Sequence, residues 1–175
     1  MHRNLHLAVL AAGLLGSPAL LQAQTSTPGS AAPISEVDKQ FLIVDAQGSA
    51  YEMAIAALAQ ARSSRDDIKA YAARILQDHA NEGADMQQLA MSKHVALPTE
   101  MTADDRAKLN GMNLQGSSTL DRSFILEAVR INEEDKKDTQ AELAATSDPD
   151  IKAFLQRYAA TDAQHESMAR ALQSR

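Results

Sequence analysis

The sequence predicts an all-α protein whose four long helices pair into two hairpins, with a short helix in the crossover between the hairpins. Hydrophobic residues make up 45% of the 175 residues, whereas aromatic residues make up only 3%. Alanine carries much of the apolar content, and alanine favours helices and disfavours strands. Apolar residues also recur at intervals of three and four, which is the period of one helix face. One domain is expected at this length.

Residues 1–23 have the pattern of a secretory signal peptide. Arg3 supplies the positive charge, residues 7–15 form a short apolar run, and Ala23 offers a small residue at the cleavage point. The apolar run is too short to cross a bilayer comfortably. We therefore expect export to a bacterial periplasm and no membrane insertion after cleavage. A buried N-terminal helix is the alternative interpretation.

A change of composition marks the start of the folded domain. Residues 24–34 are rich in Ser, Thr, Gly, Pro and Ala, which predicts a flexible linker. Ser35 and Asp38 then form a capping box, a sequence signal for a helix start. The bundle domain is therefore expected over residues 35–175.

Further start and stop signals divide this domain. Residues 63–67 form the first break, and Leu97-Pro98 follows the second helix. Pro149, one residue after Asp148, fits the first turn of the last helix. The expected long helices cover about residues 36–62, 68–94, 119–145 and 149–175, with a short helix over 102–109 and a loop over 111–118.

The two halves of the domain resemble each other at an offset of 83 residues. Residues 67–71 (DIKAY) match residues 150–154 (DIKAF), and residues 41–43 match residues 124–126 in the same register. Two related helical hairpins packed into a four-helix bundle explain this echo. Two unrelated hairpins with similar helix caps explain it as well.

The expected inner helix faces are interrupted by ionisable side chains. On the first helix the predicted inner face includes Val44, Gly48 and Glu52, and on the last helix it includes Met168. At the offset of 83, each hairpin places three such groups at one level of the bundle. The six candidate metal ligands are Glu52, His79, Glu82, Asp135, Asp162 and His165.

The spacing of these candidates matches ferritin-like di-metal sites. Such sites combine single carboxylates with Glu-x-x-His pairs on neighbouring helices. Asp162 and His165 form a pair of this kind, and His79 and Glu82 form the reversed pair. Carboxylate and imidazole ligands suit iron, manganese or zinc. A hydrogen-bonded polar layer without metal, and acids that face solvent, remain the alternatives.

Charge and composition exclude several other functions. The net charge is −6 and no basic stripe is present, which argues against nucleic acid and anionic lipid as partners. The chain has no cysteine, which excludes disulfides and thiolate sites. No nucleophile–base constellation and no glycine-rich phosphate loop is present, so no catalytic residue is predicted. A homodimer or a protein partner remains open.

A set of residues spread over most of the chain has a familiar order and spacing: Phe41-Leu42, Gly48, Glu52, Asp78-His79, Asn81, Leu97-Pro98, Asp121-Arg122 and His165. In these residues the chain, from about Val37 to Leu172, resembles the domain-of-unknown-function 4142 family, a group of exported bacterial ferritin-like proteins. The resemblance implies a ferritin-like bundle and export, and it implies no established activity. The family tends to carry a histidine in the third helix, where this chain has Asn132.

Two functions follow as hypotheses. The first is a periplasmic bundle that binds a transition metal in its interior and has a stress-protective role, with Asp78 or Tyr51 supporting the ligands. The second is a metal-independent envelope or interaction protein in which the same side chains form a structural polar layer.

Overall fold

The computed structural model describes residues 34–175, and this part of the chain is all α-helical. The predicted signal peptide and residues 24–33 of the predicted linker lie outside the described residues. No helix within residues 34–175 combines the length and the hydropathy needed to span a membrane. The five described helices are α1 (Glu36–Arg62), α2 (Asp66–Ser92), α3 (Ala103–Asn113), α4 (Ser117–Ala145) and α5 (Pro149–Gln173).

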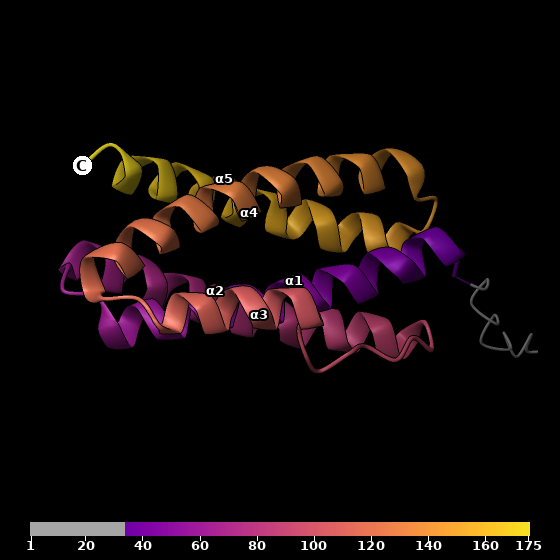
Figure 1. Cartoon of the computed structure of the whole chain (residues 1–175). Coiled ribbons are helices and arrows are strands. Elements are labelled where there is room, and N and C mark those ends of the chain that lie inside the picture. Colours follow the sequence, from indigo (N-terminus) through magenta and orange to yellow (C-terminus); the bar gives the residue numbers. More distant parts are fainter. Residues whose placement is uncertain (1–33) are drawn as a thin grey trace, which may run out of the picture. The chain divides into compact units, whose positions relative to one another are not determined.

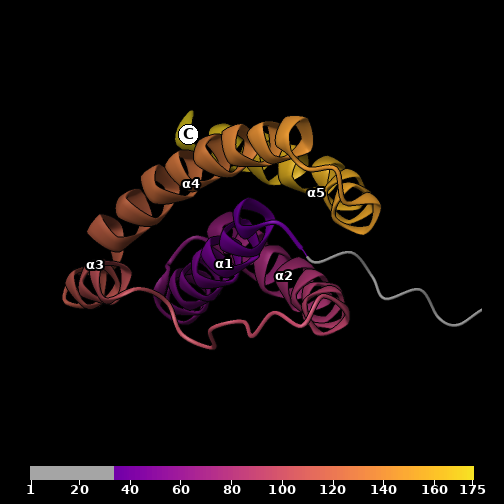
Figure 2. The ribbon, with the colours of Figure 1, turned by 90° about the vertical axis from the view of Figure 1, so that its right-hand side faces the viewer.

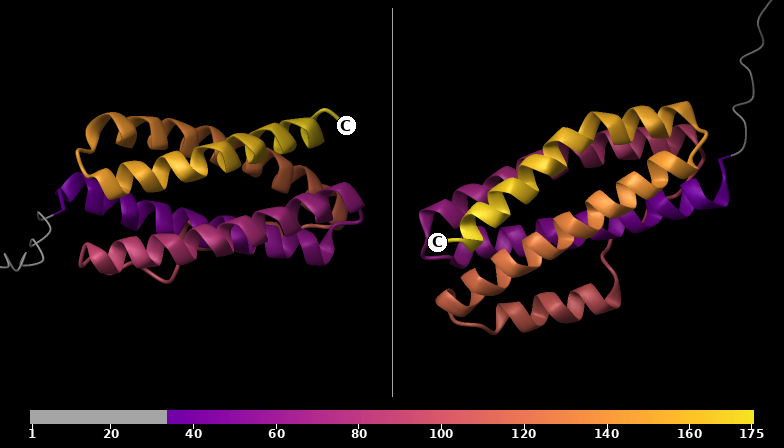
Figure 3. Two further views of the ribbon diagram at one scale, coloured as in Figure 1. Left: turned by 180° about the vertical axis from the view of Figure 1, so that it is seen from behind. Right: turned by 90° about the horizontal axis from the view of Figure 1, so that it is seen from above.

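The four long helices form two antiparallel hairpins that pack face to face (Figures 1 and 2). Helix α1 pairs with α2, and α4 pairs with α5, while α1 also packs on α4 and α2 on α5. The crossover from α2 to α4 carries α3, which lies outside the bundle against α1 and α4 (Figure 3). A long crossover between two hairpins is one of the connectivities found among four-helix bundles.

Local sequence signals set the helix starts. The Ser35 hydroxyl accepts a hydrogen bond from the Asp38 N–H at 3.0 Å, as the capping box predicts. The Thr102 side chain caps α3 in the same way, through the Asp105 N–H. The Asp148 side chain caps α5. These acceptors satisfy N–H groups that have no partner within their own helix.

Two apolar clusters fill the bundle, one toward each end. The first includes Ile55, Ile75 and Phe124, all at most 1% exposed. The second includes Leu42 and Ile151, both 0% exposed. Along every long helix, the members of the two clusters are separated by a stretch of polar inner residues. The candidate ligands therefore lie between two apolar cores.

The predicted inner faces are wrong at two positions. Val44 is 50% exposed and Met168 is 38% exposed, whereas Leu42 is fully buried. The inner face of α1 passes through Leu42, Asp45, Ser49 and Glu52, at intervals of three, four and three. Two of these positions carry small polar residues, so a search for apolar periodicity selects the neighbouring valine instead.

The predicted loop over residues 111–118 is also wrong, because it shrinks to residues 114–116 between α3 and α4. Arg62, at the end of α1, donates hydrogen bonds to the carbonyls of Asn113 and Gln115. The Ser117 hydroxyl donates to the Arg62 carbonyl at 3.1 Å. Tertiary contacts of one arginine thus fix a turn whose sequence alone suggests a longer loop.

A buried carboxyl pair closes the opposite end between α1 and α4. Asp38 is 3% exposed and Glu142 is 5% exposed, and their side chains share a hydrogen bond. Burial and the nearby Asp38 charge raise the pKa of Glu142 to about 7. Glu142 therefore holds a proton near neutral pH and donates it to Asp38.

We predict that Asp148→Ala destabilises the bundle by about 2 kcal/mol, because it removes a helix cap and an ion-pair partner of a buried lysine. Asp148 accepts from the Asp150 and Ile151 N–H groups, and Lys93 Nζ lies 2.6 Å from its Oδ2. The Lys93 side chain is only 6% exposed. Urea unfolding measures the change.

The matched control is Asp150→Ala. Asp150 also lies 2.6 Å from Lys93 Nζ, but its side chain is 65% exposed and it caps no helix. Asp150→Ala should therefore lower the free energy of unfolding by clearly less than Asp148→Ala does. Equal losses for the two variants would show that the cap contributes little.

Candidate metal centre

Three candidate ligands from three different helices meet inside the bundle. One donor atom from each of Glu52, His79 and His165 lies within 4.8 Å of the donor atoms of the other two. The side chains are 4%, 11% and 3% exposed, respectively. Within residues 34–175 this is the one group of three metal-ligating side chains that meets so closely.

His79 of α2 is held through both ring nitrogens. Its Nε2 lies 3.1 Å from Glu52 Oε2, and its Nδ1 lies 3.0 Å from Ser49 Oγ. Burial lowers the pKa of His79, but the hydrogen bond and charge of Glu52 and the charges of Glu82 and Asp135 outweigh burial and raise that pKa to about 9. His79 is therefore an imidazolium paired with Glu52 at neutral pH.

His165 of α5 has a different charge state. Its Nε2 lies 2.9 Å from Asp78 Oδ2, and Arg74 pairs with the same carboxylate. Burial lowers the pKa of His165, and although Asp78 and Glu52 oppose this shift, the pKa stays below its usual value. A neutral imidazole whose one nitrogen contacts a carboxylate can bind a metal through the other nitrogen. The two histidine rings are stacked, with centroids 5.8 Å apart.

Glu52 of α1 is the third member, and one of its oxygens has no hydrogen-bond partner. Oε2 faces His79, whereas Oε1 is buried and contacts no donor within the described residues. Burial raises the pKa of Glu52, but His79 and His165 outweigh it and lower that pKa, so the carboxylate is ionised. A buried anionic oxygen without a partner is costly, and a cation is one group that would satisfy it.

Four further carboxyl groups lie next to the cluster. Together with His79 they line a space of about 30 Å³ between the hairpins. Burial and the charges of neighbouring carboxylates, Glu52 among them, raise the pKa of each, to about 7 for Asp45, 8 for Glu82, 8 for Asp135 and 6 for Asp162. His79 is a cationic side chain that lowers all four pKa values. Asp45, Glu82 and Asp135 therefore keep a proton up to about neutral pH, which limits the negative charge at this level of the bundle.

The structure divides the six sequence-derived candidates into two sets. Glu52, His79 and His165 converge, whereas the other three, Glu82, Asp135 and Asp162, line the adjoining space without forming a second close group. The two sets are partners at the offset of 83, since Glu52 corresponds to Asp135, His79 to Asp162, and Glu82 to His165. Equivalent positions of the two hairpins thus both lie at the site, but only one residue of each pair joins the close group of metal-ligating side chains.

Two residues of the site differ from the sequence-based expectation. Asp45 is part of the acidic layer, although apolar periodicity gave no signal for it. Its spacing of seven residues from Glu52 is the signal that could have found it, because i and i+7 share a helix face. The second is Tyr51, which was one of two residues expected to support the ligands but donates to Glu127 instead. Asp78, the other expected support, does contact His165.

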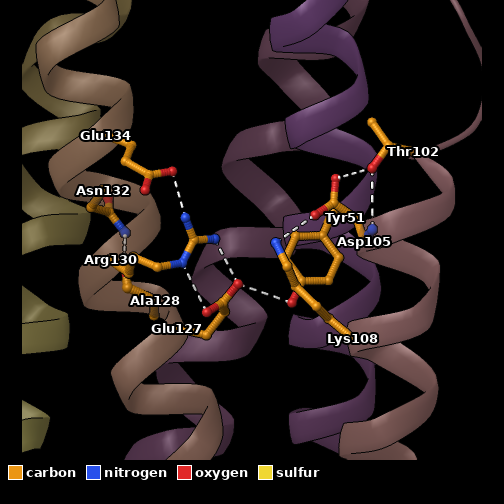
Figure 4. A network of polar contacts seen from close by, with 9 residues as sticks. All are labelled: Tyr51, Thr102, Asp105, Lys108, Glu127, Ala128, Arg130, Asn132 and Glu134. Carbon is orange, nitrogen blue, oxygen red and sulfur yellow. Dashed lines mark hydrogen bonds and ion pairs between the residues drawn. The ribbon is translucent and has the colours of Figure 1, made fainter.

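Tyr51 belongs instead to a network that joins α1, α3 and α4 (Figure 4). Its hydroxyl donates to Glu127 at 3.0 Å, and Arg130 pairs with both Glu127 and Glu134. Lys108 of α3 lies over the Tyr51 ring and pairs with Asp105. The network holds the crossover helix against the bundle beside the candidate metal centre.

Asn132 occupies the position where the family resemblance suggests a histidine. It is 4% exposed, and its amide donates to the Ala128 carbonyl at 2.7 Å (Figure 4). Its second contact is with the Tyr71 hydroxyl at 3.5 Å. The Asn132 amide is thus satisfied by its own helix and by Tyr71, and Asn132 is not one of the three converging side chains.

Comparison with known families identifies the fold and the domain. The family model "Domain of unknown function (DUF4142)" matches residues 23–172. The chain belongs to the DUF4142 family. No curated protein matches the sequence.

A solved structure shares the fold of this DUF4142 domain. It is described as a crystal structure of a DUF305 fragment from Deinococcus radiodurans, and it superposes with a TM-score of 0.72. The match covers 81% of this chain and 98% of that chain at 15% sequence identity. At this identity the similarity concerns the helical architecture alone.

For the metal-free DUF4142 domain, we predict that stability falls as pH rises from about 5 to 8. In the unfolded chain the acidic side chains lose their protons near pH 4. In the bundle, Asp45, Glu82, Asp135 and Glu142 keep theirs to about pH 7 or 8. The native state then binds more protons than the unfolded state, so the free energy of unfolding decreases with pH.

Melting curves in the presence of EDTA measure this trend. Asp135→Asn should flatten it by up to about 1.4 kcal/mol per pH unit, the contribution of one proton. Glu133→Gln, an exposed position on the same helix, should leave the slope unchanged. A metal-free protein whose stability rises over this window would contradict the assignment.

Proposed function

We propose that this DUF4142 domain binds one transition-metal ion, with Glu52, His79 and His165 as ligands, in the periplasm after export. The observation that supports this proposal most strongly is the convergence of one carboxylate and two imidazoles from three helices. Such a donor set suits iron, manganese or zinc.

The surroundings of the three side chains fit a cation. Glu52 contributes an ionised carboxylate with one unpartnered buried oxygen. His165 is neutral, and Asp78 orients its ring, as is common for metal-binding histidines. A bound metal would displace the proton of His79, which then would serve as a neutral ligand while Ser49 and Glu82 contact its other nitrogen.

Bound iron or manganese would supply one-electron chemistry, which is the basis for a stress-protective role of the domain. The chain itself would bind the ion and shield it from solvent, since the three ligands lie between two apolar clusters. Export is supported by the composition of residues 1–23.

The alternative is a metal-independent polar layer. The ion pair between His79 Nε2 and Glu52 Oε2, at 3.1 Å, favours it because this pair already neutralises one buried carboxylate. In that case the histidines would serve the stability and specificity of the bundle, and the protein would act through its surface.

We predict that the metal-free protein binds iron(II), manganese(II) or zinc(II) at one equivalent. Saturation at about 100 times the Kd should stabilise the fold by about 2.7 kcal/mol, because the ion binds the native state selectively. Isothermal titration and melting curves measure both quantities. Absence of binding and unchanged melting curves with all three metals would favour the polar layer instead.

Ligand variants locate the site. His165→Ala should weaken binding by more than about 100-fold, and Asp78→Asn, which removes only the orienting carboxylate, by about 10- to 100-fold. His94→Ala is the control, because His94 lies exposed just beyond the end of α2. An affinity that survives His165→Ala would place the ion elsewhere.

A further inference from the structure

A cavity joins the candidate metal centre to the surface between α1 and α4. Its volume is about 200 Å³, and Glu52 and His79 line its inner part. Other lining residues, among them Val44, Lys108 and Asp138, are exposed, so the cavity reaches solvent on the side covered by α3. The smaller space next to it, between the hairpins, is lined on the α5 side by Phe154, Leu155, Tyr158 and Asp162.

Gly48 forms an open part of this cavity wall. A Cβ atom added at Gly48 would have no neighbouring atom within 4 Å beyond its own surroundings on the helix. Glycine in a helix interior is unfavourable relative to alanine, so neither helix propensity nor steric crowding explains its presence. Any larger side chain here would project into the cavity that leads to the ligands.

The charges of the cavity favour cations. Asp45, Asp135 and Asp138 line it in addition to Glu52. The basic residues that line it are already paired, because Lys108 donates to Asp105 at 2.9 Å, Arg130 binds Glu127 and Glu134 (Figure 4), and His79 pairs with Glu52. The negative charge of Asp138 at the exposed end raises the local concentration of cations, and the carboxyl oxygens deeper in the cavity are groups that cations bind. At the inner end, the unpartnered Oε1 of Glu52 offers a cation its first buried ligand.

We propose that a divalent cation reaches Glu52, His79 and His165 through this cavity, and that Gly48 keeps the route open. The proposal rests on the proposed function, since it describes how the ion arrives at that site. The acidic side chains along the route replace lost hydration water before the two imidazoles bind the ion. Arg130 and the crossover helix α3 hold the outer wall of the route in place.

Cobalt(II) is a suitable probe, because its visible absorption changes when nitrogen and oxygen ligands replace water. Stopped-flow mixing with the metal-free full chain measures association, and competition with a chelator measures release. Gly48→Leu should slow both processes by about tenfold or more, since the ion must then wait for side chains to move. The equilibrium affinity should change little, because position 48 is not a ligand.

Gly83→Leu is the matched control. Gly83 also lies inside a long helix and also has no atom near an added Cβ, but it does not line the cavity. Its replacement makes the same change in helix propensity and should leave both rates unchanged. Equal slowing by the two variants would overturn the role of Gly48.

A second variant tests the route if Gly48→Leu does not fold. Asp138→Asn removes a charge at the exposed end of the cavity without adding bulk, so association should become slower and less sensitive to salt. Unchanged association in this variant, or in a folded Gly48→Leu protein, would overturn the proposed route. Absence of cobalt binding by the unmodified protein would instead refute the proposed function itself.

Discussion

The structure depends on the placement of charged side chains between two apolar cores. Each core alone would be an ordinary helix–helix interface of Leu, Ile and aromatic residues. Between them, every long helix presents carboxylates or imidazoles to its neighbours. Such groups must be paired, protonated or bound to a cation, because isolated buried charges are too costly to retain.

The bundle uses the first two solutions in different parts of this layer. His79 and Glu52 form an ion pair, and Asp78 receives both Arg74 and His165. The acids at the neighbouring level, such as Glu82 and Asp135, retain protons instead, which is why their pKa values rise to about 8. Binding of a cation would replace protonation by coordination, and this exchange links metal binding to proton release.

The crossover helix gives the layer its asymmetry. Helix α3 packs mainly on α1 and α4, so the two sides of the bundle differ although the hairpins echo each other in sequence. Its Lys108 lies over the Tyr51 ring of α1, and an acidic cavity remains on the α1–α4 side. The fold shared with the DUF305 fragment at 15% identity shows that the helical framework tolerates very different sequences.

The sequence by itself determined the helices, their pairing into hairpins and the presence of ionisable groups on their inner faces. These features are local: Ser35 and Asp148 cap their helices through groups within three residues, and an apolar period needs no partner to be recognised. The tertiary structure decided which groups meet. Helix period gives the face of Glu52 or Asp135, but the rotation and shift of one helix against another come from packing. Only packing therefore brought three ligands together, placed Asp45 rather than Val44 inside, and left Asp162 in the adjoining acidic layer.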